Sequence, residues 1–395
     1  MAAADRTILI AGAGIGGLAA AIALAGRGFK ITLIEQRPGL AEEGAGIQLG
    51  PNATRVLAAL GVAPHLHGRA VTPGVLRLHS ARTGGALATM PLGEHMVARH
   101  GAPYWVLHRA ELQETLWSAC RDEPRIDVRF GWCLATFTAA DQGVAISSTT
   151  GERLEGAALI GADGLWSQVR AGLGDGGPPR ASGKVAWRAL VDPARLPVDL
   201  DIRDVGIWMG PEAHVVHYPV LGGRRLNLVV VVDDPLLSED WNAPADAAEL
   251  WPHLTAWPQR IRGLLHAADG WRRWTLWERP VAGRWSKGPV TLLGDAAHPV
   301  LPFLAQGAGL ALEDAVVLRN CLAAMPDQLA AAFANYVQRR RWRVMRVQAA
   351  SRQNGAMFHS RGVMGLARDL VLQAMPRERL LARLDWLYGF DAASA

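Results

Sequence analysis

A glycine-rich segment near the start of the chain constrains the fold more than any other feature of the sequence. Residues 12–17, GAGIGG, match the pattern G-x-G-x-x-G with glycines at Gly12, Gly14 and Gly17. A β-rich run precedes the segment, and an alanine-rich helical run follows it. Glycines in this position let the backbone approach a pyrophosphate at the helix N-terminus, where free N–H groups favour anions. The pattern predicts a β-α-β unit that binds a dinucleotide.

An acidic residue lies at the sequence position where such β-α-β units usually bind a ribose. A second strand is expected over residues 31–34, and Glu35 follows it, 23 positions after Gly12. A carboxylate at this distance accepts hydrogen bonds from ribose hydroxyls. The glycines and the acid together favour a nucleotide site over an ordinary tight turn. They do not separate NAD from FAD.

Two later turns each place an aspartate after an apolar strand. Residues 157–162 and 290–293 are expected to be buried parallel strands. The first ends in Gly161-Ala162-Asp163-Gly164 and the second in Gly294-Asp295. Each aspartate belongs either to the nucleotide site or to a helix or turn cap.

The middle of the chain predicts a different kind of sheet. Short strand-like runs cover residues 184–191, 205–209, 214–220, 226–232 and 271–277, with a Gly222-Gly223 hairpin turn between two of them. We therefore expect an α/β fold with a Rossmann-like nucleotide-binding domain, an inserted antiparallel-sheet substrate domain and a helical C-terminal tail. The nucleotide-binding domain would take residues 1–75, 100–180 and 283–395, and the substrate domain 76–99 and 181–282. Helices are expected over 307–324, 328–350 and 363–386, and the arginine-rich stretch 339–346 is expected to be solvated or to face a second subunit.

Charge and cysteine content argue against several classes of protein. The net charge of +5 comes from arginines scattered among acidic residues, because the chain has only three lysines, so no nucleic-acid surface is expected. The three cysteines are widely separated and lack metal-ligand spacing, which favours reduced thiols in the cytoplasm and no metal site. The apolar stretch 8–25 is interrupted by glycines, so we expect no integral membrane segment.

The order and spacing of the three turns resemble the class A flavoprotein monooxygenases, the para-hydroxybenzoate hydroxylase-like family, whose fingerprints are GxGxxG, a DG turn and a GD turn. Three further segments are similar to the branch that includes salicylate hydroxylase, 3-hydroxybenzoate 6-hydroxylase and 6-hydroxynicotinate 3-monooxygenase. They are residues 44–53 (GAGIQLGPNA), 108–112 (HRAEL) and 304–309 (LAQGAG).

The resemblance implies an enzyme that binds FAD non-covalently and uses NADH or NADPH and O2 to hydroxylate a small phenolic aromatic. A hydroxybenzoate, a salicylate or a hydroxynicotinate-like acid would be the substrate, and reduced flavin would capture O2 as a C4a-hydroperoxide. NADH is expected to be preferred to NADPH, and the protein to be a monomer or homodimer. An FAD-dependent dehydrogenase or reductase on the same scaffold, or a non-catalytic FAD-binding protein, are the alternatives.

The resemblance also implies roles for individual residues. Asp295 would bond the ribitol of FAD, Arg109 and Gln48 would contact the FAD chain, and Asp163 would brace the site. Residues 307–309 open a helix, whose N–H groups suit a flavin that gains negative charge on reduction. The full set of expected cofactor-binding residues is Gly12, Gly14, Ile15, Gly17, Glu35, Arg37, Gln48, Arg109, Asp163, Gly294, Asp295, Gly307 and Ala308.

The candidate catalytic residues lie in the strand-like run of residues 214–219. Strand alternation places His214 and Tyr218 on one face and His217 on the other. In the related hydroxylases a histidine and a tyrosine at this spacing line the substrate pocket, which selects His214 and Tyr218. A histidine with a pKa near neutrality can accept a phenolic proton. The alternative is that His214 is a core histidine, and His298 in the GD turn is expected to be structural.

Overall fold

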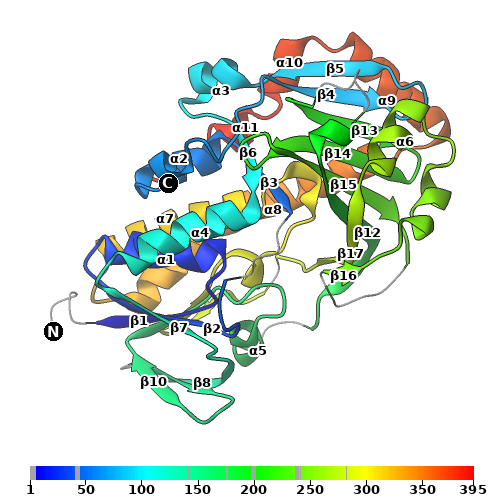
Figure 1. Cartoon of the computed structure of the whole chain (residues 1–395). Coiled ribbons are helices and arrows are strands. Elements are labelled where there is room, and N and C mark those ends of the chain that lie inside the picture. Colours follow the sequence, from blue (N-terminus) through cyan, green and yellow to red (C-terminus); the bar gives the residue numbers. More distant parts are fainter. Residues whose placement is uncertain are drawn as a thin grey trace.

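The computed structural model describes residues 6–40, 45–140, 143–174, 177–196, 202–235, 240, 242–281 and 283–395 (Figure 1). Two large sheets organise this part of the chain. One carries the predicted nucleotide-binding unit, and the other contains the candidate catalytic strand. Helices from the C-terminal third of the sequence run beside both.

The first sheet has the strand order β18-β19-β11-β1-β2-β7. Neighbouring strands are parallel except for the pair β18 and β19. The strand order reverses between β1 and β11, and doubly wound sheets bind their ligands at such a point, beyond the carboxyl ends of the strands. The strands are β1 (Thr7–Ala11), β2 (Lys30–Glu35), β7 (Ile126–Phe130), β11 (Ala158–Gly161), β18 (Ser286–Lys287) and β19 (Val290–Leu292).

Alternating side chains bury the two faces of this sheet in different cores. Ile8 and Ile10 pack with the helices α1, α4 and α7, whereas Leu9 and Ala11 pack with a small sheet ordered β10-β9-β8. Figure 1 shows the three helices together above β1 and β7. The elements are α1 (Ile15–Ala25), α2 (Pro51–Ala59), α3 (Gly93–His100), α4 (Arg109–Arg121), α5 (Gln168–Gly172), α7 (Gly307–Ala324), β8 (Leu134–Ala140), β9 (Gly143–Ser148) and β10 (Arg153–Gly156).

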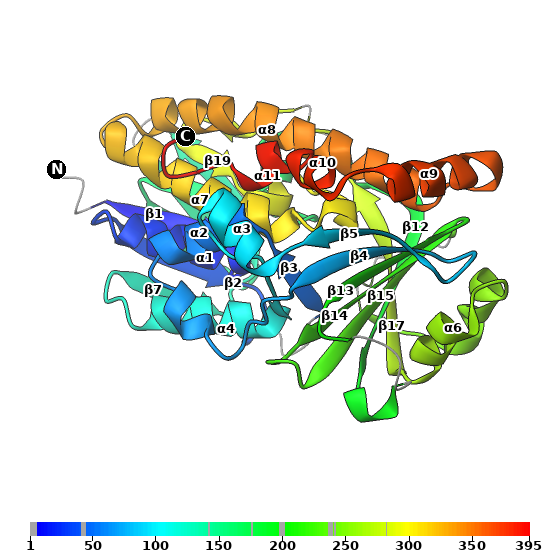
Figure 2. The same ribbon diagram turned by 90° about the horizontal axis from the view of Figure 1, so that it is seen from above.

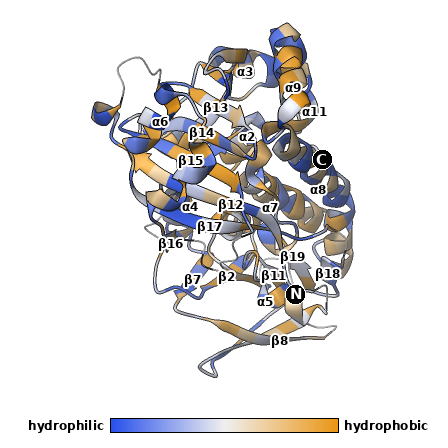
Figure 3. Ribbon diagram, turned by 90° about the vertical axis from the view of Figure 1, so that its right-hand side faces the viewer, coloured by the Kyte–Doolittle hydropathy of each residue, from blue (hydrophilic) through white to orange (hydrophobic). Residues whose placement is uncertain are grey.

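The second sheet has eight strands in the order β16-β17-β12-β15-β14-β13-β4-β5. All pairs are antiparallel except β13 with β4, so the expectation of a wholly antiparallel sheet needs that one correction. Hydrophobic residues run along its central strands (Figure 3). The strands are β4 (Val75–Ser80), β5 (Ala86–Pro91), β12 (Arg180–Val191), β13 (Val205–Gly210), β14 (Ala213–Val220), β15 (Arg225–Asp233), β16 (Ala243–Pro244) and β17 (Asp269–Glu278).

The expected mixed α/β architecture is confirmed. The predicted hairpin joins β14 to β15, and both Gly222 and Gly223 have positive φ. Strands from residues 75–91 and 180–278 share the eight-stranded sheet, but the domain boundaries themselves stay a prediction, and residue 282 lies outside the described residues. A short ribbon of β3 (Gly46–Leu49) and β6 (Trp105–His108) lies between the two large sheets, and α6 (Gln259–His266) covers the far face of the second.

The helical tail differs from the prediction in two respects. The helix expected over 363–386 is three helices, α9 (Gly362–Ala374), α10 (Arg377–Ala382) and α11 (Asp385–Tyr388), while α8 (Leu329–Phe358) is longer than expected (Figure 2). Pro376 explains the break, because a proline disfavours helical backbone at the preceding residue. Met375 accordingly adopts an extended ψ of 124°.

The prediction that the arginines of residues 339–346 are solvated is wrong for Arg340 and Arg343, which are buried. Arg340 Nε donates to Asp314 Oδ1 at 2.6 Å, and Arg343 donates two hydrogen bonds of 2.6 Å to Glu313. Asp314 Oδ2 also contacts His298 Nε2 at 2.6 Å. The two arginines therefore pair α8 with α7 inside the core.

The same network fixes the GD turn. The backbone N–H of Gly294 donates to Asp314 Oδ2 at 3.0 Å, so the turn is tied to α7 through one carboxylate. The neighbouring charges of His298 and Arg340 hold the pKa of Asp314 well below its usual range despite its burial. The structural role expected for His298 agrees with its place in this network.

Candidate active site

Four of the expected cofactor-binding residues follow strands of the first sheet. Gly12 follows β1, Glu35 ends β2, Asp163 comes after β11 and Asp295 after β19. Because parallel strands present their carboxyl ends at one edge, the fold brings these residues to the same side of the sheet.

The glycine loop is shaped to leave room at the N-terminus of α1. Gly12 has φ of +104°, and a Cβ there would lie 2.5 Å from the carbonyl oxygen of Ala162. A Cβ on Gly17 would lie 1.9 Å from the Gly12 carbonyl oxygen, whereas one on Gly14 would meet no atom within 4 Å. No side chain caps the helix that starts at Ile15. Open space beside uncapped N–H groups fits a dinucleotide phosphate.

Glu35 braces this loop. Its carboxylate accepts hydrogen bonds from the backbone N–H of Ala13 at 2.8 Å and from that of Arg37 at 3.0 Å. A carboxylate has lone pairs beyond these two bonds, so Glu35 can also accept from ribose hydroxyls. Arg37 itself is exposed at the same edge.

Asp163 performs the capping function that the sequence left open. One oxygen accepts from the Ser167 hydroxyl at 2.6 Å, and the other accepts from the backbone N–H groups of Gln168 and Val169 at 2.8 and 3.1 Å. These bonds start α5. A contact of Asp163 with FAD stays a prediction.

Asp295 and the start of α7 were expected to form the other side of the nucleotide site. Asp295 is exposed although residues 290–294 and 296–299 are buried, so its side chain faces open space at the edge of the sheet. Burial of its surroundings raises the pKa of Asp295, while His298 and Arg109 oppose that shift. Gly307 and Ala308 begin α7, which no side chain caps. An exposed carboxylate beside an uncapped helix start is compatible with FAD, and contacts of Asp295 and α7 with FAD stay predictions.

We expect Asp295→Ala to weaken FAD binding about 10- to 100-fold, because a hydrogen bond to a charged group is worth about 1.5–3 kcal/mol. The Kd of FAD for the apoprotein, measured by flavin fluorescence, tests this. Asp246→Ala serves as the control, since Asp246 caps a short turn by accepting from the Ala248 N–H. Equal FAD affinity in parent and Asp295→Ala would contradict the assignment of the GD turn.

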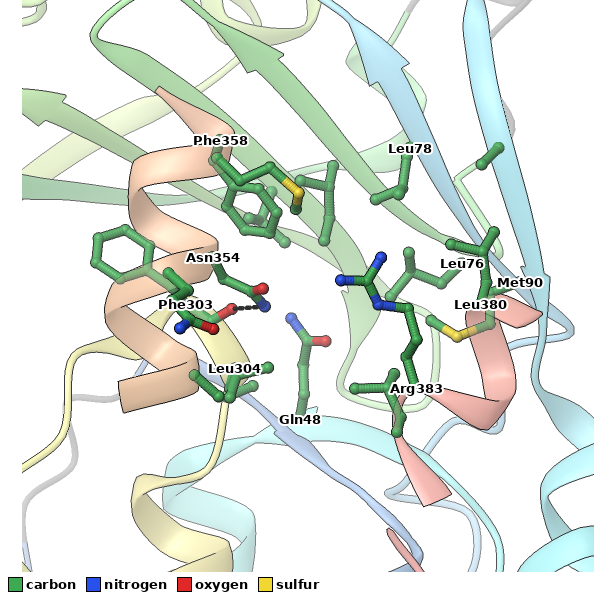
Figure 4. Close-up of a pocket in the computed structure, with 18 of the residues that line it drawn as sticks. Gln48, Leu76, Leu78, Met90, Phe303, Leu304, Asn354, Phe358, Leu380 and Arg383 are labelled. Carbon is green, nitrogen blue, oxygen red and sulfur yellow. Dashed lines mark hydrogen bonds between the residues drawn. The ribbon is translucent and has the colours of Figure 1, made fainter. Parts of the chain in front are cut away.

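A cavity of about 340 Å³ lies between the eight-stranded sheet and the C-terminal helices (Figure 4). Most of its lining is apolar, and polar groups reach it from a few side chains only. Arg383, which follows α10, points into the cavity, as does Gln48 from β3. Among the described residues that line the cavity, Arg383 is the one with a permanent charge. The polar and titratable lining residues are Gln48, Tyr104, His214, Gln353, Asn354, Arg383 and Tyr388.

His214 lines this cavity from β14 and is buried at 3% exposure. Its ring lies 5.5 Å from that of Phe303 and 5.2 Å from that of Phe358, centroid to centroid. Burial lowers the pKa of His214 well below its usual range, not near neutrality as expected from the sequence, so the ring is neutral at neutral pH and one of its nitrogens is unprotonated. Its catalytic role stays a prediction.

Tyr218 does not line the cavity as the family resemblance implied. It is buried on the same side of β14, where its ring packs against Gly46: a Cβ on that glycine would lie 2.5 Å from Tyr218 Cε2. Burial raises the pKa of Tyr218, and a hydrogen bond with Gln48 opposes that shift. Tyr218 therefore lies behind Gln48, one residue removed from the cavity.

Gln48 faces the cavity, and its Oε1 accepts a 2.6 Å hydrogen bond from the Tyr104 hydroxyl. A contact between Gln48 and the FAD chain stays a prediction. Arg109 is half-buried, and burial lowers its pKa while the charge of Asp295 opposes that shift. Gln48 lies in β3 and Arg109 follows β6, so both belong to the two-stranded ribbon between the nucleotide edge and the cavity. Gly44, the first residue of the motif before Gln48, lies outside the described residues.

Sequence reasoning missed several residues that line the cavity or contact His214. Arg383 and Tyr388 lie far from the motifs, and His359 contacts His214 from the end of α8. No local pattern marks these three, because the tail returns to the cavity only after α8 has crossed the molecule (Figure 2). Tyr104 lies four residues before the 108–112 segment but is not part of that motif.

Comparison with known proteins agrees with this geometry. The family model described as FAD binding domain matches residues 5–351. The chain is 37% identical over 392 residues to a 3-hydroxybenzoate 6-hydroxylase of Polaromonas naphthalenivorans (strain CJ2), with 99% of this chain and 98% of that enzyme covered. A 6-hydroxynicotinate 3-monooxygenase of Bordetella bronchiseptica is 32% identical over 358 residues, with 88% and 91% covered. Klebsiella pneumoniae HpxO, solved in complex with FAD and uric acid, aligns with a TM-score of 0.84 at 27% identity, over 96% and 95% of the two chains.

The chain belongs to the FAD binding domain family. It is an FAD-dependent monooxygenase that hydroxylates an aromatic ring with NAD(P)H as co-substrate, which confirms the predicted family, activity and cofactors. When bound, FAD supplies the redox chemistry, and a protein of this class contributes binding, orientation and electrostatics. No helix of the described residues is long and apolar enough to cross a membrane. Within the same residues, no cluster of three His, Cys, Asp or Glu side chains is placed to hold a metal ion.

Proposed function

We propose that the substrate is a phenolic aromatic carboxylic acid of the 3-hydroxybenzoate type, and that Arg383 binds its carboxylate. The observation that carries this proposal is a single guanidinium in a cavity whose walls are mostly apolar and whose polar side chains are otherwise uncharged amides, phenols and a neutral histidine. An arginine pairs with a carboxylate through two parallel hydrogen bonds. Relatives named for hydroxybenzoate and hydroxynicotinate substrates support the same class.

In this proposal the phenolic oxygen of the substrate lies beside the His214 side chain. A neutral imidazole accepts the phenolic proton, and the resulting phenolate makes the ring a stronger nucleophile toward activated oxygen. The apolar walls, which include Leu76, Leu78 and Met90, exclude water from the ring. Tyr104 holds Gln48 in place, so an amide also reaches the cavity. Binding and proton removal are thus assigned to separate side chains.

Replacement of Arg383 by methionine tests the proposal. We expect KM for 3-hydroxybenzoate to rise at least tenfold, because a hydrogen bond to a charged group is worth about 1.5–3 kcal/mol. The KM for phenol, which has no carboxylate, should change less than twofold. Arg379→Met is the matched control, since Arg379 is exposed on α10 and does not line the cavity. Similar losses for both ligands, or no loss for either, would contradict carboxylate binding by Arg383.

The preference for NADH over NADPH stays a prediction that rests on family resemblance. It is tested by comparing kcat/KM for the two donors at saturating aromatic substrate, and a clear preference for NADPH would overturn it. A cytoplasmic location and a monomeric or homodimeric state are likewise proposed. The free state of Cys120, Cys133 and Cys321 supports a reducing compartment.

A further inference from the structure

Three polar side chains form a continuous path from the cavity to the protein surface, and Lys184 pairs with the last of them. His214 Nδ1 lies 2.8 Å from His359 Nε2, and His359 Nδ1 lies 2.7 Å from Asp233 Oδ1. Lys184 Nζ forms an ion pair with the same oxygen of Asp233. The side chain of His359 is 4% exposed, whereas that of Asp233 is 38% exposed. The path therefore starts at a buried ring and ends at a carboxylate in contact with solvent.

The hydrogen bonds assign the proton positions in this path. Two groups lie beside His359 Nδ1: the Asp233 carboxylate at 2.7 Å and Lys184 Nζ at 3.3 Å. Asp233 is ionised and can only accept, and Lys184 is already paired with it, so we assign the ring proton to Nδ1, which donates to Asp233. Neutral His359 then has its lone pair on Nε2 and accepts a hydrogen bond from His214 Nδ1–H. His214 is left with an unprotonated Nε2 as its remaining nitrogen. Asp233 thus sets the tautomers of both rings so that the residue lining the cavity is a proton acceptor.

The surroundings favour passage of a proton over storage of one. Burial lowers the pKa of both histidines, and the nearby charge of Lys184 lowers them further. His359 caps the C-terminus of the 30-residue helix α8, whose dipole favours a positive charge there. Asp233 contacts the same ring, and its own pKa is lowered by its bonds to His359 and Lys184. The cavity end of the path disfavours a proton, and the far end is beside the solvent.

We propose that His359 and Asp233 are positioning residues that carry the phenolic proton from His214 to solvent. This inference rests on the proposed function. The phenol O–H bond breaks and a proton joins His214 Nε2, while the Nδ1 proton of His214 moves to His359 Nε2. The Nδ1 proton of His359 then moves to Asp233 and leaves to water, so one proton is released and the substrate becomes a phenolate. A proton that passes in the opposite direction onto the product restores both tautomers.

The other groups near the path do not offer a second exit. Burial raises the pKa of Tyr104 and Tyr388, so neither phenol accepts a proton at neutral pH. Arg383 is a cation with no acceptor. The negative charge of Glu212 also acts on His359, but Glu212 forms an ion pair with Arg361 at the surface. Among the described residues of the cavity wall, His214 is the one whose side chain is a neutral base.

The test measures proton release when 3-hydroxybenzoate binds to the FAD-loaded enzyme. Stopped-flow mixing in weak buffer with phenol red follows the release of protons. The flavin absorbance, recorded in the same experiment, reports ligand binding. The parent should release close to one proton per bound ligand in step with binding. Asp233→Asn and His359→Gln should bind the ligand with the parent flavin signal but release the proton at least tenfold more slowly. Asp234→Asn is the matched control, because that carboxylate lies 3.9 Å from His253 and belongs to a different pair.

A rescue experiment separates proton transfer from a structural effect. His359→Gly leaves a space of imidazole size, and added imidazole should restore fast release in that variant and not in Asp233→Asn. Ligand binding without proton release in the parent, or parent release rates in both path variants, would overturn the relay. If 3-hydroxybenzoate leaves the flavin spectrum unchanged, the proposed substrate is wrong, and the same measurement with phenol then decides the relay.

Discussion

His214→Ala is expected to slow hydroxylation by about a hundredfold or more, the usual effect of losing a general base. The variant should still bind FAD, because His214 lies in the cavity beneath the eight-stranded sheet and not at the nucleotide edge. NADH oxidation should continue and become uncoupled, with hydrogen peroxide replacing hydroxylated product. Product and peroxide formed per NADH, measured together with the rate of flavin reduction and the FAD content, test this prediction.

His217→Ala provides the matched control. His217 is equally buried on β14 but faces the opposite way, against Gly206. Its loss should affect packing without uncoupling, since it has no access to the substrate. A collapsed sheet would damage flavin reduction and hydroxylation alike in either variant. An uncoupled His217→Ala with a normal His214→Ala would mean that the other face of β14 serves the substrate.

The second large effect is expected at Asp314. Asp314→Ala removes one partner of a buried network and leaves Arg340 and His298 beside an uncompensated gap, which should cost about 3–5 kcal/mol of unfolding free energy. Urea denaturation of the FAD-loaded protein measures this loss. Asp127→Ala is the control, because the exposed pair of Asp127 with Arg129 should contribute less than about 1 kcal/mol. Losses of equal size would show that the network does not stabilise the fold.

The pH dependence of that loss has a definite sign. The pKa of Asp314 in the folded protein lies below its ordinary value of 3.8, so the ionised carboxylate stabilises the folded state above that pH. The contribution declines as the pH falls below about 4 toward the lowered folded-state pKa. The difference between parent and Asp314→Ala should therefore be larger at pH 7 than at pH 3. No difference between these two pH values would contradict the ionised pairing of Asp314.

The nucleotide edge could be predicted from sequence because each fingerprint combines a strand with the turn that follows it. The glycines, Glu35 and Asp295 depend on local backbone geometry, and parallel pairing then brings them together. Strand alternation places His214, Val216 and Tyr218 on one face of β14, and the family resemblance selected that face for the substrate. His214 and Val216 line the cavity, but Tyr218 does not. The expectation of one helix over residues 363–386 missed the break, although Pro376 disfavours helical backbone at Met375.

The parts that escaped prediction depend on contacts between distant segments. Arg340 and Asp314 are 26 residues apart on separate helices, and the arginine-rich stretch shows no sign in sequence of which guanidinium is buried. Arg383 reaches the cavity, and His359 reaches His214, only because α8 spans the molecule before the chain turns back. Such placements follow from tertiary packing, which a single sequence does not display.

Oxygen-18 incorporation during turnover tests whether this protein is an FAD-dependent aromatic hydroxylase. The purified enzyme, NADH and 3-hydroxybenzoate are incubated under ¹⁸O₂, and product mass is measured against the NADH consumed. We expect one ¹⁸O atom in each hydroxylated ring and a product-to-NADH ratio near one, both depending on bound FAD. NADH-dependent turnover that leaves the aromatic ring without ¹⁸O would contradict the claim.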